Sequence, residues 1–160
     1  MDQEEAIQFF RKDHQKLEDV VSKLTEFQMK THKIQGSWTV KDIIAHISAW
    51  NWEIILQAEL VLSGKKPWYT YKTEADFNKE AVKSRESWSL EKIISEWHES
   101  FDTLISKLES FSAEEWNFEL DDEWPEGGKV SVSSVFGYRY HGEGHEGGHA
   151  KIIRDYFELS

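Results

Sequence analysis

The chain has 160 residues, of which 39% are hydrophobic and 14% aromatic. This composition is typical of a folded globular protein, and the length suits a single domain spanning residues 1–160. Acidic residues outnumber basic ones by 30 to 19, giving a net charge of −11. That charge disfavours nucleic acid and anionic membrane surfaces as partners, because both would repel the chain.

The absence of cysteine narrows the chemistry. It excludes disulfides, thiolate metal ligands and a cysteine nucleophile. The first residues, Met1 to Glu5, are acidic where a signal peptide would be basic, and no apolar run reaches membrane-spanning length. We therefore expect a soluble cytoplasmic protein.

Hydrophobic periodicity predicts the first two long helices. Apolar residues recur every three to four positions from near Asp2 to about Met29, which predicts one long helix there. Thr39 can cap a second helix, with Asp42 as the acidic partner of a capping box. Its apolar stripe continues to about Ser63.

The segment that follows predicts a crossover rather than a tight hairpin. Residues 64–73 carry glycine, proline and three aromatics, and residues 74–85 form a short polar helix. Ser89 then opens a third long helix that ends near Phe111. A single capped turn is expected at residues 112–115.

The last part of the chain predicts a loop and a glycine-rich fourth helix. Residues 117–129 are acidic and turn-rich, and the helix should begin near residues 131–134 and end at Phe157. A glycine in a helix interior costs about 1 kcal/mol relative to Ala, so either another contact offsets this cost or the helix is broken. The glycines concerned are Gly137, Gly142, Gly144, Gly147 and Gly148. The whole pattern predicts an all-α four-helix bundle with a crossover insertion between its second and third helices.

Three histidines form the strongest candidate site. His145 and His149 are four residues apart on the stripe of the fourth helix that should face the core. His46 lies at the edge of the second helix's buried stripe and can point toward them. Because neutral imidazole is the commonest transition-metal ligand, we predict a divalent-metal site, preferably for Zn²⁺, with Ni, Fe or Mn as alternatives.

Two other interpretations of these histidines stay open. A single histidine at a core edge is more often a hydrogen-bonded packing residue than a ligand, although two imidazoles on one core stripe are costly to bury without partners. The run from His145 to His149, with Glu146 second, also matches the His-Glu-x-x-His pattern of zinc proteases. Only eleven residues follow His149 and none is histidine, so we interpret that match as accidental.

Weaker candidates surround the histidines. Glu53, His141 and Glu146 are catalytic candidates by spacing alone, and a solvated carboxylate or a surface histidine is the commoner outcome for such residues. Aromatic residues in the second helix and the irregular segments could line a pocket or simply pack: Trp50, Trp68, Tyr69, Tyr71 and Trp124. The remaining histidines are interpreted as structural or exposed: His14, His32 and His98.

Two segments resemble a known family. The run from Trp38 to Trp50, which contains His46, resembles the second-helix signature of the DinB-like superfamily of four-helix bundles. The run from His145 through His149 to Tyr156 resembles the paired-histidine pattern of its fourth helix. Asp76-Phe-Asn78, followed by the run that Ser89 opens, is similar to the branch that includes the ClbS and DfsB proteins.

The resemblance implies a metal triad of His46, His145 and His149. It also implies a small-molecule substrate, which is hydrolysed as ClbS is described to do with a genotoxin, or modified by transfer or isomerisation with an external thiol such as mycothiol or bacillithiol. The thiol must be external because this chain has no cysteine. Two alternatives remain: a metal-free ClbS-like hydrolase or sequestering protein for an electrophilic small molecule, and a non-catalytic homodimeric bundle.

Overall fold

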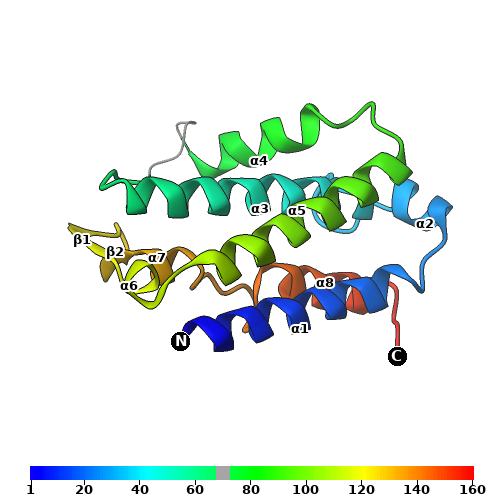
Figure 1. Cartoon of the computed structure of the whole chain (residues 1–160). Helices are drawn as coiled ribbons and strands as arrows, with labels where there is room; N and C mark the ends of the chain where they lie inside the picture. The colour runs from blue at the N-terminus through cyan, green and yellow to red at the C-terminus, as the bar shows by residue number, and fades with distance from the viewer. Residues whose placement is uncertain (68–72) are drawn as a thin grey trace.

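A computed structural model describes residues 1–67 and 73–160 of the protein. Four long helices form the bundle: α1 (Gln3–Val21), α3 (Val40–Leu62), α5 (Leu90–Ser110) and α8 (His145–Tyr156). The helix α1 packs along α8, α3 packs along α5, and α1 also contacts α5 (Figure 1). The predicted all-α four-helix bundle is therefore confirmed.

Side-chain caps set the starts of the helices. Asp2 and Glu5 form a capping box at α1, and Thr39 and Asp42 form the predicted one at α3. Ser89 caps α5 by accepting a hydrogen bond from a backbone N–H group. Each cap supplies an acceptor for backbone N–H groups that the helix itself leaves unpaired.

The predicted helix from Asp2 to Met29 is wrong in its second half. The helix α1 ends at Val21, and a separate helix α2 (Glu26–Thr31) follows. The break arises because Thr25 and Gln28 form a capping box that starts a new helix. Apolar spacing alone did not reveal this restart.

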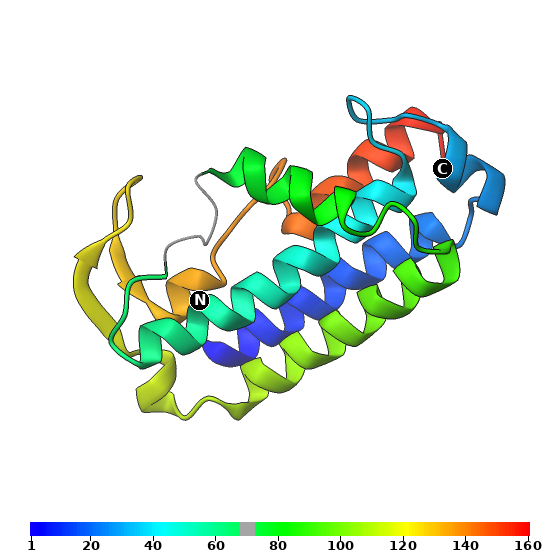
Figure 2. The same ribbon diagram turned by 90° about the horizontal axis from the view of Figure 1, so that it is seen from above.

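The predicted crossover after α3 is confirmed where the structure describes it. The short helix α4 (Glu74–Lys83) runs along the outside of α3 (Figure 2). Its Phe77 and Ala81 are buried against Ala49 and Trp50. This helix therefore covers the part of α3 around Ala49 and Trp50.

The predicted loop at residues 117–129 contains a small β-hairpin. After the single-turn helix α6 (Ala113–Trp116), strand β1 (Glu119–Glu123) pairs antiparallel with β2 (Lys129–Ser131). Gly127 and Gly128 allow the turn, since both have positive φ. The acidic sequence of β1 carried no clear strand signal.

The glycine-rich fourth helix is broken into two. Helix α7 (Val132–Val135) ends at once, and α8 begins only after an irregular segment of residues 136–144. Gly137, Gly142 and Gly144 therefore lie outside helix interiors, and the helical penalty does not apply to them. Gly147 and Gly148 remain inside α8, where close neighbours explain them below.

Besides the small Ala49–Phe77–Ala81 cluster under α4, the described residues form two large clusters of buried apolar residues. One lies at the hairpin end and joins α1, α3 and α5 to α6, β2 and α7, while the other joins the same three long helices to α2 and α8. The three candidate ligands, His46, His145 and His149, lie beside the second cluster.

Among the described residues, no helix is both long and apolar enough to cross a membrane.

Candidate metal centre

Three histidine rings converge at the predicted place. The Nε2 atom of His145 lies 2.9 Å from Nε2 of His46 and 3.2 Å from Nε2 of His149. His46 comes from the second turn of α3, and the other two occupy one face of α8 because they are four residues apart. His46 and His149 are only 5% and 2% exposed.

Hydrogen bonding alone does not satisfy these rings. A neutral ring nitrogen carries either one proton or one lone pair, so Nε2 of His145 can complete a good hydrogen bond with only one of its two neighbours. The buried Nδ1 atoms of His46 and His149 have no hydrogen-bond partner in the described part of the chain. Burying such groups is costly unless something else binds them.

The spacing fits a divalent cation. Three nitrogens that bind Zn²⁺ at 2.0–2.1 Å with tetrahedral angles lie about 3.3 Å apart. The two Nε2 separations, 2.9 and 3.2 Å, are close to that value. Three protein ligands also leave one position free, as in catalytic rather than structural zinc sites.

The local electrostatics keep the rings neutral, which is the form that binds metal. Burial lowers the pKa of His46 to about 4, and the nearby Asn78 side chain opposes this only in part. Burial, followed by repulsion from His46, lowers the pKa of His149 to about 3. The pKa of His145 is lowered in the same way, first by burial and then by His149 and His46.

Aromatic side chains that the sequence did not single out enclose the triad. The Trp38 ring lies 4.8 Å from that of His46, and the Tyr140 ring lies 4.8 Å from that of His149. Tyr138 lies edge-on to His145 at 5.8 Å. Both tyrosines belong to the segment before α8 that was predicted as helix, so their place beside the site could not be foreseen.

Two cavities adjoin this region of α3 and α4. The nearer one, of about 480 Å³, is lined by Trp38, Asn78, Lys79 and Lys83 among others. Trp38 both lines this cavity and packs on His46, whereas none of the three triad histidines is among the cavity's lining residues. The other cavity, of about 250 Å³, is lined by Glu53 and Arg85 among others.

Glu53 is buried but does not join the triad. Its side chain is 8% exposed, and burial raises its pKa, while a long 3.5 Å contact with the Gln57 amide lowers it only in part. Two turns of α3 separate it from His46. A catalytic role for Glu53 stays a prediction.

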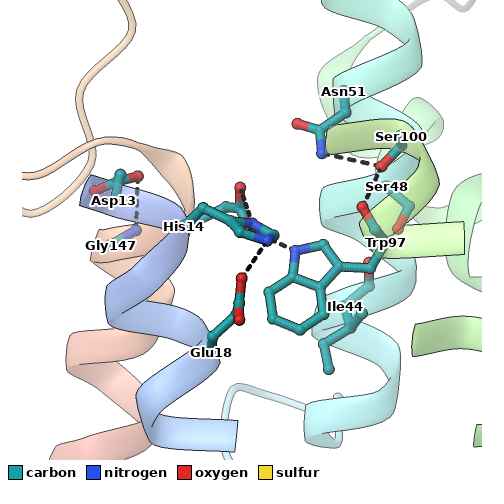
Figure 3. Close-up of polar contacts among 10 residues, drawn as sticks. Asp13, His14, Glu18, Ile44, Ser48, Asn51, Trp97, Ser100 and Gly147 are labelled. Carbon is teal, nitrogen blue, oxygen red and sulfur yellow. Dashed lines mark hydrogen bonds and ion pairs between the residues drawn. The ribbon is translucent and has the colours of Figure 1, made fainter. Parts of the chain in front are cut away.

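Glu146 is not solvated, contrary to the expectation for an accidental motif match. It is 4% exposed and accepts hydrogen bonds from Nε1 of Trp97 and, at 2.9 Å, from Nδ1 of His14. Figure 3 shows the His14 ring between Glu18 and the Trp97 indole. Glu146 thus serves a polar network on the other side of α8 from the triad, where no zinc-protease base would lie.

Asp13, which sequence reasoning missed, holds the start of α8. Its buried carboxylate accepts hydrogen bonds from the backbone N–H groups of Gly144 at 3.2 Å and Gly147 at 2.8 Å. A Cβ atom at Gly144 or Gly147 would overlap this carboxylate, and one at Gly148 would overlap Tyr140. These glycines are therefore needed for the close approach of α1 and Tyr140 to α8.

The other predicted site residues are not part of the three-histidine cluster. His141 lies outside α8, with φ of 53°, and its ring packs against Tyr140. Trp50 donates a hydrogen bond to Asn78 at 2.6 Å, and Trp124 donates one to Ser134 at the hairpin end. Trp68, Tyr69 and Tyr71 lie outside the described residues.

The fold and this site define a class: a four-helix bundle with a three-histidine cluster between its second and fourth long helices. Residues 10–153 match the DinB superfamily. The chain belongs to that superfamily. No curated protein is significantly similar to it.

Two solved structures of similar fold are of one enzyme. The mycothiol-dependent maleylpyruvate isomerase aligns with a TM-score of 0.71 at 14% identity, covering 98% of this chain and 59% of that one. A histidine-to-alanine mutant of that isomerase gives 0.69 at 15% identity, covering 85% and 55%. The chain thus spans well under two thirds of the isomerase's length, and at this identity the likeness shows the fold.

Proposed function

We propose that the protein is a divalent-metal-dependent enzyme that acts on a small molecule at His46, His145 and His149. The convergence of their three Nε2 atoms carries this proposal. Nε2 of His145 lies 2.9 Å from Nε2 of His46 and 3.2 Å from Nε2 of His149. A bound ion, preferably Zn²⁺, would act as a Lewis acid toward a water molecule or toward the thiol of an external low-molecular-weight compound.

The surrounding residues have separate tasks. Trp38 and Tyr140 shield the ring edges from water, and the exposed Tyr138 presents an apolar face to a substrate. The cavity beside Trp38 offers space for a small molecule, and its lining carries Lys79 and Lys83 against the single carboxylate of Glu86, which favours an anionic one. Because the chain has no cysteine, thiol chemistry requires a thiol from outside.

The comparison of folds favours the thiol-dependent form over hydrolysis. The solved structures of similar fold are of an isomerase described as mycothiol-dependent, whereas the open metal position would serve a bound water and a bound thiol alike. Hydrolysis by the same site, as the ClbS-like resemblance suggests, is the second candidate. The converging rings argue against a purely packing role for the histidines.

The test compares metal-loaded and chelated protein with electrophilic small molecules, each with and without mycothiol, bacillithiol or glutathione. We expect conversion that needs both metal and one of the thiols, and that is lost in His149→Leu but kept in His32→Ala. Conversion that needs metal but no thiol would favour the hydrolase. Full conversion after exhaustive chelation would contradict metal dependence and favour the metal-free ClbS-like alternative.

A further inference from the structure

A second group of metal-ligand side chains lies between α1 and α5, apart from the triad. It consists of His14, Glu18 and His98, and one ligand atom from each lies within 4.8 Å of the others. His14 and Glu18 are one turn apart on α1, with Nε2 and Oε1 separated by 2.8 Å. His98 comes from α5, with its ring 5.6 Å from that of His14.

The His14 ring is held as a metal-binding histidine usually is. Its Nδ1 donates to the buried Glu146 carboxylate at 2.9 Å, which leaves Nε2 directed toward Glu18. A histidine that binds metal almost always donates its other ring N–H to a carboxylate, a carbonyl or water in this way. Trp97 in turn holds Glu146 through a hydrogen bond from Nε1.

Packing fixes this ring as firmly as the hydrogen bonds do. Its face stacks on Phe101 with ring centres 3.7 Å apart and planes 4° apart, and His14 is only 5% exposed. The ring is therefore already ordered, which lowers the entropic cost of binding. An ion would replace the direct contact of 2.8 Å between Nε2 of His14 and Oε1 of Glu18. The Glu18 side chain is 40% exposed, so an ion and its water can reach the cluster from solvent.

The donor set also indicates the kind of ion. Two imidazoles and one carboxylate suit Zn²⁺, Cu²⁺ or Ni²⁺, whereas Mg²⁺ and Ca²⁺ prefer oxygen ligands. We propose that His14, Glu18 and His98 bind a second divalent transition-metal ion. This site lies on the other side of α8 from the triad, and its occupancy does not depend on the proposed enzyme activity.

The experiment is a Zn²⁺ binding measurement on untagged, chelator-treated full-length protein, by equilibrium dialysis with elemental analysis. We expect two ions per chain in the wild type and one in His98→Ala. His149→Leu should also bind one, and the double variant none. If the triad binds no metal, the wild type binds one ion and His98→Ala none, so failure of the two sites is distinguishable.

Matched controls distinguish Zn²⁺ binding at this site from nonspecific Zn²⁺ binding by surface imidazoles or carboxylates. His32→Ala and Glu99→Gln remove the same side-chain types elsewhere and should keep both ions. Glu18→Gln should weaken the second ion by at least about 10-fold. An unchanged number and affinity of ions in His98→Ala, with its circular dichroism spectrum unaltered, would overturn the proposal, as would a wild type that binds at the triad alone.

Discussion

The two sides of α8 differ in how their buried polar groups are satisfied. On one side, the Glu146 carboxylate and the Gly147 N–H group have protein partners in Trp97, His14 and Asp13. On the other side, the His149 ring converges with two other rings and leaves Nδ1 without a hydrogen-bond partner in the described residues. The contacts of Glu146 and Asp13 therefore stabilise the fold, whereas the triad leaves the buried Nδ1 atoms of His46 and His149 without hydrogen-bond partners among the described residues.

Replacing one residue on each side with leucine should give the largest contrast. Glu146→Leu leaves two buried donors without an acceptor and should lower the free energy of unfolding by about 3–5 kcal/mol. His149→Leu removes an unsatisfied group and replaces it with a side chain of similar volume. It should change the free energy of unfolding of the metal-free protein by less than about 1 kcal/mol. Urea unfolding of both variants checks this, and equal losses would show that the two sides do not differ.

Adding metal should make the triad histidines stabilise the fold, although they contribute little in the metal-free protein. In a His98→Ala background, which isolates the triad, Zn²⁺ at 100 times its dissociation constant should stabilise the fold by about 2.7 kcal/mol. The same addition to a His98→Ala/His149→Leu variant should have no such effect. Thermal unfolding with and without Zn²⁺ measures the difference, and equal stabilisation of both variants would place the ion elsewhere.

Gly147→Ala should damage the paired side although alanine normally favours a helix. The added Cβ would overlap the Asp13 carboxylate. We therefore expect the free energy of unfolding to fall by about 2 kcal/mol, instead of the usual rise of about 1 kcal/mol for glycine to alanine in a helix. Gly137→Ala, whose Cβ would lie 3.3 Å from the Ser134 oxygen, serves as the milder control. A stabilised Gly147→Ala protein would contradict the close approach of α1 to α8.

The pH dependence of stability should show the smallest effect. Burial raises the pKa of Asp13 above its usual 3.8, although the Gly147 and Gly144 hydrogen bonds oppose this. Between 3.8 and the raised value, the folded chain holds a proton that the unfolded chain has released, so stability falls as the pH rises through that range.

Asp13→Asn should remove that contribution. The plot of the free energy of unfolding against pH should then become less steep by at most about 1.4 kcal/mol per pH unit. Denaturant unfolding across this acidic range measures the slope. Since the asparagine amide oxygen can still accept from Gly147, the helix start should persist. An equally steep curve in Asp13→Asn would assign the pH dependence to other groups.

Local patterns predicted the residues of the three-histidine cluster because their information is local. The four-residue spacing of His145 and His149, and the place of His46 on the stripe of α3, depend only on helix geometry. The cap at Thr39 was predictable for the same reason. Each of these features needs only a few neighbouring residues to define it.

The surroundings of the site depend on contacts between distant segments. Asp13 and Gly147 are 134 positions apart, so no local pattern pairs them. The two glycines inside α8 did carry a usable signal, because a glycine kept in a helix often marks a close approach of another segment. The aromatic residues Tyr138 and Tyr140 were missed because their segment was assigned to a helix that begins only at His145.

The metal content of the triad tests the central claim most directly. Untagged His98→Ala protein, loaded with Zn²⁺ and dialysed, should hold one ion per chain by elemental analysis. Adding His46→Ala, His145→Ala or His149→Leu should abolish that ion, while adding His32→Ala should not. Absence of a stoichiometric ion in the His98→Ala protein, or an unchanged ion after loss of any triad histidine, would contradict a metal centre at His46, His145 and His149.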